Sequence, residues 1–146
     1  MNRVNFSAEE VPLPAWSKKA KTFVNGVLEY LNKDRWSLSV MFCADGRIKD
    51  LNQKFRKKNE ATDILTFNLG ETENGFFLPG DIAISLDTLA ENSAYFKVTP
   101  DEELRRLLIH GILHLDGMDH KTNGPGEPML RLQEKILADL AGVHII

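Results

Sequence analysis

A chain of 146 residues that is 42% hydrophobic can bury one core of its own, and it is too short for two comfortable domains. Its formal net charge of −3 argues against a protein that coats nucleic acid without specificity, although one face can still carry a local basic patch. The single cysteine, Cys43, excludes an internal disulfide and fits a reducing compartment. We find neither an apolar signal core near the N-terminus nor a run of transmembrane length, so we expect a cytoplasmic protein with no membrane partner.

The first part of the chain begins with a short strand pattern at residues 3–6. A helix is predicted over residues 14–32, because Pro14 suits a first turn and apolar side chains then recur at helical spacing. Residues 37–43 alternate and are rich in β-forming side chains, which predicts a second strand.

The middle of the chain is expected to contain one helix and two strands. Asp45 is a candidate cap for a short helix that runs through Phe55. Strands are predicted at residues 63–69 (DILTFNL) and 80–85 (GDIAIS), with a polar turn over residues 70–75 between them.

The clearest helix start in the sequence follows residue 98. Thr99 is a good N-cap, Pro100 suits the first helical position, and three acidic residues then lie at the positive end of the helix. A preceding helix, capped by Ser85 or Asp87, is predicted through Tyr95, and a last helix is predicted over residues 127–141.

These elements mix strands and helices without an internal repeat or a linker. We therefore predict a single α+β domain over residues 1–146, with a small mixed sheet of about four strands covered by helices.

Three of the four histidines lie in the stretch HGILHLDGMDH, at residues 110–120. His110 and His114 are four residues apart on the predicted helix, so both rings are expected on the same face. Gly117 can adopt the left-handed backbone that reverses the chain and returns His120 towards the other two. Three histidine nitrogens with an open fourth position are typical of a catalytic zinc site, and we take these residues as candidate metal ligands.

The residue after the first histidine separates this pattern from the helical zinc peptidases. Those enzymes use His-Glu-x-x-His, and the glutamate is their general base. The longer metzincin pattern adds a glycine and a third histidine at the spacing found here. Gly111 occupies the position of the glutamate, so a peptidase of the usual mechanism is disfavoured.

The histidine block resembles the signature of the YbeY family of bacterial endoribonucleases, His-Gly-x-Leu-His-Leu-x-Gly-Tyr-Asp-His. Two further stretches, FRKKNEATDILTFNL and GDIAIS, resemble other blocks of that family and occur in the same order. Met118 and Ala61 depart from the family pattern, which has tyrosine and proline at these positions, and neither change removes a candidate ligand.

The resemblance implies a metal-binding helix like that of metalloproteases and one Zn²⁺ ion held by His110, His114 and His120. It also implies that the enzyme acts on single-stranded RNA, in rRNA 3′-end maturation of the small subunit and in ribosome quality control. The implied partners are therefore rRNA and the ribosome or its small subunit, whereas the oligomeric state stays open. By the same resemblance, Arg56 takes the role of the family's functional arginine.

The chemistry of phosphodiester cleavage suggests roles for the other residues. An arginine fork neutralises phosphate, and Arg56 belongs to a locally basic segment that fits either a nucleic-acid backbone or an ordinary solvated helix end. Asp116 or Asp119 could orient a metal-binding histidine by accepting a hydrogen bond from its other ring nitrogen. Asp119 is favoured because it matches a family position. The attacking group could be a water molecule or the RNA 2′-hydroxyl, and the sequence does not choose between them.

Other readings remain open at this level. The chain could be a metallohydrolase of another substrate class, such as a peptidase, or a ribosome-associated zinc protein without activity. Asp63 and Asp81 also match family blocks, but turn hydrogen bonds explain them equally well. Phe76 and Phe77 could stack bases, although core packing is the favoured interpretation.

Overall fold

The computed structural model describes residues 1–146, with four strands and five helices. The elements in chain order are β1 (Arg3–Ala8), α1 (Ser17–Tyr30), β2 (Ser37–Cys43), α2 (Asp45–Arg56), β3 (Ile64–Glu73), β4 (Phe76–Ser85), α3 (Leu86–Phe96), α4 (Pro100–Leu115) and α5 (Pro128–Asp139). No helix is long and apolar enough to cross a membrane.

The strands form one mixed sheet in the order β1-β2-β4-β3. Strands β1, β2 and β4 are parallel, and β3 returns antiparallel to β4 as an edge strand. The predicted α+β architecture, with a small mixed sheet covered by helices, is therefore confirmed.

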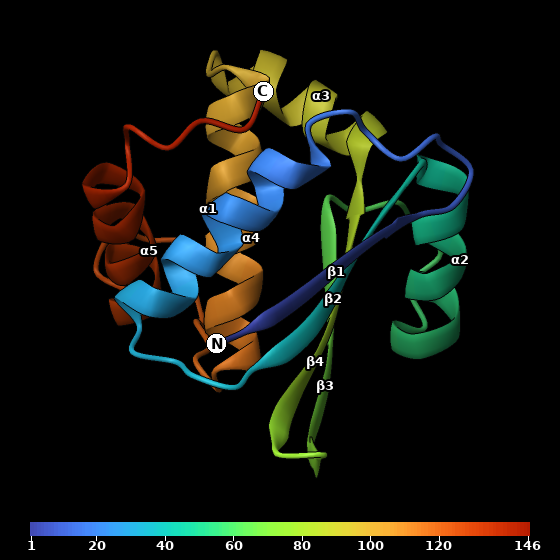
Figure 1. Cartoon of the computed structure of the whole chain (residues 1–146). Coiled ribbons are helices and arrows are strands. Elements are labelled where there is room, and N and C mark those ends of the chain that lie inside the picture. Colours follow the sequence, from blue (N-terminus) through green and yellow to red (C-terminus); the bar gives the residue numbers. More distant parts are fainter.

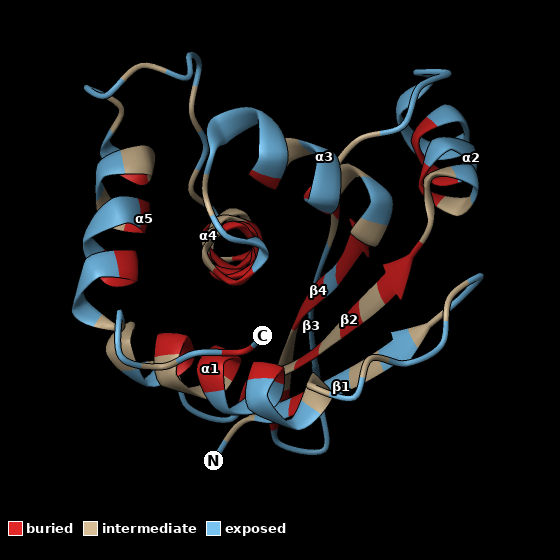
Figure 2. Ribbon diagram, turned by 90° about the horizontal axis from the view of Figure 1, so that it is seen from above, coloured by how far each residue is buried: buried red, intermediate tan, exposed pale blue.

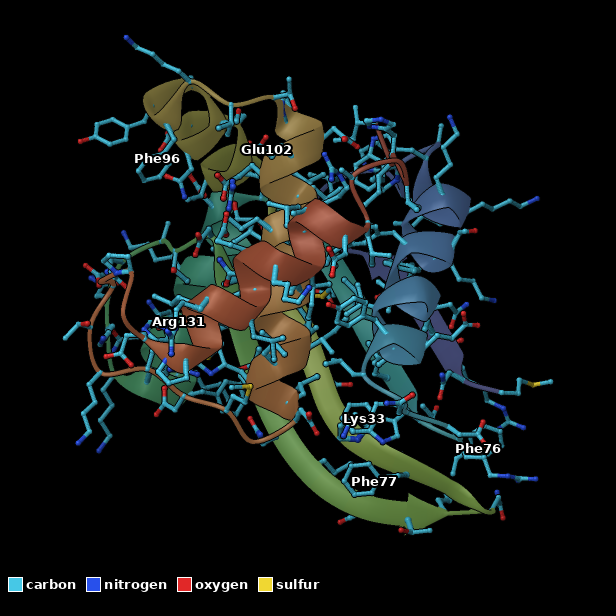
Figure 3. The ribbon with its side chains drawn as sticks, turned by 90° about the vertical axis from the view of Figure 1, so that its left-hand side faces the viewer. Lys33, Phe76, Phe77, Phe96, Glu102 and Arg131 are labelled. Carbon is cyan, nitrogen blue, oxygen red and sulfur yellow. The ribbon has the colours of Figure 1, made fainter.

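The helices cover the two faces of the sheet unequally. Helices α1 and α4 pack on one face, while α2 lies on the opposite face (Figures 1 and 2). The larger apolar core lies on the α1 and α4 side and contains 24 buried residues. A smaller cluster of five buried residues, Cys43 among them, lies between the sheet and α2. Helix α5 packs across α4 (Figure 3), on the side away from the sheet.

Two of the predicted helix starts need correction. The first helix begins at Ser17 instead of Pro14, because the N–H of Ser17 donates to the Pro14 carbonyl in a separate turn. Asp45 is the first helical residue of α2 and does not cap it. Its carboxylate instead accepts hydrogen bonds from the hydroxyls of Ser85 and Thr88, at 2.7 and 2.6 Å, and so ties α2 to the start of α3.

The polar turn predicted at residues 70–75 is mostly strand. Strand β3 continues past its predicted end to Glu73, with a break in register between Asn68 and Glu71. Asn74 and Gly75, both at positive φ, make the tight turn into β4. Figure 3 shows Phe76 and Phe77 at this hairpin end of the sheet. Phe77 packs against the larger core, so the core interpretation is confirmed for this ring. Phe76 is buried too, but it belongs to neither apolar cluster and lies under the Arg3 guanidinium, whose Cζ is 3.8 Å from the ring centroid.

The start of α4 is held as the sequence predicts and by one further contact. Thr99 accepts a hydrogen bond from the N–H of Glu102 at 3.1 Å. Asp101, in the first turn, accepts hydrogen bonds from the N–H groups of Ile145 and Ile146 at 2.6 and 2.9 Å, and it pairs with Arg105. Burial alone raises the pKa of Asp101, but these hydrogen bonds outweigh it and lower the pKa to about 2.

Candidate metal centre

Three histidines come together at the C-terminal end of α4. His110 and His114 lie one turn apart on the helix, as the spacing predicts. The chain reverses at Gly117, where φ is 92°, and this reversal returns His120 to the same place. One ring nitrogen from each histidine lies within 4.8 Å of those of the other two, so the three can hold a metal ion.

A glutamine on α5 orients the first histidine. The Nδ1 atom of His110 lies 2.6 Å from Oε1 of Gln133. The amide orientation is set by its other end, because Nε2 of Gln133 donates to Glu134 at 3.0 Å. Oε1 can only accept, so Nδ1 of His110 carries the proton and its Nε2 offers a lone pair.

Backbone carbonyls orient the other two rings. Nδ1 of His114 donates to the carbonyl of Met118 at 3.1 Å, and Nδ1 of His120 donates to the carbonyl of Thr122 at 2.8 Å. The unprotonated Nε2 atoms of His114 and His110 then face each other at 3.0 Å. Two lone pairs at this distance do not form a hydrogen bond, and a shared cation is the group that such a pair fits.

The protonation state of the histidines fits the same interpretation. Burial lowers the pKa of His110 and of His114, which favours the neutral rings that bind metals. Three neutral imidazoles without a fourth protein ligand suit zinc with one open position, and they also accept nickel, copper or iron. The residues present therefore fit a catalytic metal ion.

His110 and His114 line a polar pocket of about 490 Å³ at the edge of the sheet. Arg56, at the end of α2, lines the same pocket although α2 packs on the opposite face of the sheet from α4. Its Nη2 donates to the carbonyl of Thr66 at 3.4 Å, across the outer edge of β3. The guanidinium and the histidines are thus brought together from opposite faces of one edge strand.

The aspartates near the histidines make different contacts from those expected. Asp119 lines the pocket, but its carboxylate accepts from the backbone N–H of His120 and not from a ring. Asp116 pairs with Lys33 at 2.7 Å. Asp63, which also lines the pocket, accepts a hydrogen bond from Asn92. The orienting role assigned to an aspartate is filled by Gln133 and two carbonyls.

Gly111 lies where α4 approaches the sheet closely. A Cβ atom at this position would lie 3.0 Å from the side chains of both Ile64 and Ile82. Position 111 therefore faces the sheet, and a glutamate there would enter the apolar contact between α4 and the strands.

Gln133 is the site residue that the sequence analysis missed. It lies on a different helix from the ligands, and no sequence motif contains it. One signal was available, because Gln133 occupies the apolar face of α5 with Met129, Ile136 and Leu137. A buried polar residue on such a face needs a hydrogen-bond partner.

Similar proteins were found by sequence and by structure. The family model described as endoribonuclease YbeY matches residues 3–141. An endoribonuclease YbeY from Treponema pallidum (strain Nichols) is 47% identical over 143 residues, covering 94% of this chain and 89% of that protein. One from Treponema denticola is 42% identical over 132 residues, covering 87% and 85%. The solution structure of a protein from Thermotoga maritima has a TM-score of 0.66 at 29% identity, covering 95% of this chain and 89% of the other.

Proposed function

The chain belongs to the endoribonuclease YbeY family, and on this premise we propose that it is a zinc-dependent endoribonuclease that cuts single-stranded RNA. Its proposed work is the maturation of the small-subunit rRNA 3′ end and ribosome quality control, in the cytoplasm and in contact with the ribosome. The observation that carries the proposal is the set of three oriented histidines, two of which line one polar pocket together with Arg56.

The ligand roles are proposed for His110, His114 and His120. In each ring Nδ1 donates a hydrogen bond to an oxygen atom, so Nε2 is already free to bind the metal ion. When bound, a zinc ion supplies Lewis acidity that polarises a phosphate oxygen and makes a nearby hydroxyl or water easier to deprotonate.

Arg56 is proposed as the phosphate clamp. Its guanidinium is exposed, forms no ion pair with an acidic side chain, and keeps most of its N–H donors free for a ligand. A phosphate in the pocket would be bound from the α2 side by Arg56 while its other oxygens face the histidines. This arrangement neutralises charge on the phosphate during cleavage.

Asp119 is proposed as the group that accepts a proton in the pocket. One carboxylate oxygen accepts from the N–H of His120, and that contact holds the side chain at the pocket wall. The carboxylate can take the proton of a water molecule or of an RNA 2′-hydroxyl. Both routes use the same base.

The position of Gly111 argues against a peptidase. The glutamate base of helical zinc peptidases follows the first histidine. In this chain the residue at that position is Gly111, which packs against Ile64 and Ile82. A role without catalysis is disfavoured because no fourth protein ligand closes the histidine cluster.

Cleavage of an end-labelled single-stranded RNA by the zinc-loaded protein tests the proposal. His114→Ala, purified in the same way, is expected to lose both bound metal and cleavage. Arg56→Glu is expected to keep its zinc, measured by elemental mass spectrometry, and to lose cleavage. Equal cleavage by wild type and His114→Ala would point to a contaminating nuclease and would refute the assignment.

A further inference from the structure

Phe55 is an aromatic side chain that the fold does not bury. It is 56% exposed although it lies on α2, whose neighbouring apolar residues Ile48 and Leu51 are buried. Its ring meets that of Phe67 edge-on, with 5.2 Å between the ring centroids and an angle of 71° between the planes. This contact holds the ring in place, and more than half of the side chain stays exposed.

The open ring lies between two pockets. Phe55 and Phe67 line a second pocket of about 510 Å³, on the sheet face that α2 covers only in part. The next residue along the chain, Arg56, lines the histidine pocket. A ligand that extends from the histidines around the edge of β3 therefore meets Arg56 first and Phe55 next.

Charge around the ring favours a polyanion. Lys54, Arg56, Lys57 and Lys58 are all exposed and none of them forms an ion pair with an acidic side chain. The Nζ atom of Lys54 lies 5.3 Å from the centroid of the Phe55 ring. Arg47, on the other side of the second pocket, is instead neutralised by Glu9.

The wall of the second pocket is less basic than the segment around Phe55. Six of its ten lining residues are hydrophobic, and Asp81 is its one carboxylate. An apolar wall with a carboxylate repels a phosphate but suits a base, whose flat face is apolar and whose amino groups can donate to Asp81.

We propose that Phe55 and the pocket beside it form a nucleobase subsite, which binds a base of the RNA strand flanking the cleavage position. The base stacks on the exposed ring of Phe55, and the adjacent phosphates lie against the free cations of residues 54–58. This inference rests on the proposed function, because it takes RNA as the substrate of the neighbouring histidine pocket. In this proposal residues 54–58 bind a base as well as the phosphates of the RNA backbone.

The test is a binding experiment with a fluorescent single-stranded RNA of twelve nucleotides and the zinc-loaded full chain. Stopped-flow anisotropy reads binding before cleavage proceeds, and a gel reads cleavage of the same RNA. Phe55→Leu is expected to weaken binding about tenfold, since loss of one stacked base costs roughly 5- to 150-fold. Phe55→Trp, which retains a stacking face, is expected to bind at least as tightly as the wild type.

An abasic site moved along the RNA separates stacking from a general effect on the fold. The wild type is expected to show one position at which loss of the base weakens binding about tenfold, and Phe55→Leu is expected to lose that dependence. Tyr95→Leu is the matched control, because Tyr95 is an aromatic residue 78% exposed on α3 that lines neither pocket.

The outcomes distinguish the subsite from the nuclease. If Phe55→Leu binds RNA as tightly as the wild type and still cleaves it, the subsite proposal is refuted and the proposed nuclease activity stands. Binding that depends on Phe55 without any cleavage would support the subsite and refute the nuclease. Equal weakening of intact and abasic RNA by Phe55→Leu, or no binding of RNA by the wild type, would overturn the stacking role.

Discussion

Replacing Gln133 by leucine tests how far the metal centre depends on a residue outside the ligand set. The substitution removes the acceptor 2.6 Å from Nδ1 of His110 and keeps an apolar side chain of similar size at a position that is 7% exposed. His110 would then lose the contact that fixes its protonated nitrogen. We expect zinc affinity to fall about 10- to 100-fold, or roughly 1.4 to 2.7 kcal/mol of binding free energy. This is the range seen when a residue that is hydrogen-bonded to a metal-binding histidine is replaced.

The measurement is competition for zinc against a chromophoric chelator, with the absorption of the cobalt-loaded protein as a second readout of ligand geometry. Arg131→Leu is the matched control, because Arg131 is exposed on the same helix and forms no ion pair (Figure 3). Gln133→Glu should retain zinc affinity, since a carboxylate accepts the same hydrogen bond and makes the ring a better donor. An unchanged zinc Kd in Gln133→Leu would refute the orienting role.

Two further predictions concern stability. Gly111→Ala should lower the free energy of unfolding by about 1 kcal/mol, measured by urea denaturation. The new methyl group presses on Ile64 and Ile82, and the higher helix propensity of alanine offsets only part of that cost. Wild-type stability would mean that the two isoleucines can move aside. The folded state holds the pKa of Asp101 at about 2, below its ordinary value of 3.8, so its contribution is complete above pH 4 and is lost as the pH falls towards 2. That contribution is about 2 kcal/mol, and Asp101→Asn should flatten the stability profile over this window; an equally steep profile in the variant would assign the loss to other carboxylates.

The features that the sequence predicts well are local ones. The cap at Thr99, the spacing of His110 and His114 and the reversal at Gly117 all depend on residues within a few positions of one another. Three of the four strands were placed within two residues at their starts, and the hairpin strand that begins at Phe76 was placed too late. Pro79 and Gly80 interrupt the strand pattern after the apolar start of β4, and the end of β3 is polar, so hydrophobic alternation could not mark the limits of the hairpin.

The features that the sequence did not predict depend on packing between distant elements. Gln133 reaches His110 only because α5 packs across α4. The resemblance assigned Arg56 to the site but not its route there: Arg56 shares a pocket with His114 because β3 is an edge strand, around which a side chain from α2 can reach. Asp45 was expected to cap its own helix, yet its carboxylate accepts hydrogen bonds from Ser85, at the end of β4, and from Thr88, on α3.

The edge position of β3 also bears on self-association and on which polymers can dock there. A free edge ten residues long invites a strand from another chain to add to the sheet. Here the Arg56 guanidinium occupies the carbonyl of Thr66, the register breaks after Asn68, and Glu71 and Glu73 place exposed charge along the rest of the edge. These devices hinder pairing with any polypeptide, whether a second copy or a peptide laid out as an extra strand. A nucleic acid does not bind by forming a ladder of backbone amide hydrogen bonds. The same edge therefore disfavours polypeptide strands and still allows a nucleic acid to approach the histidines.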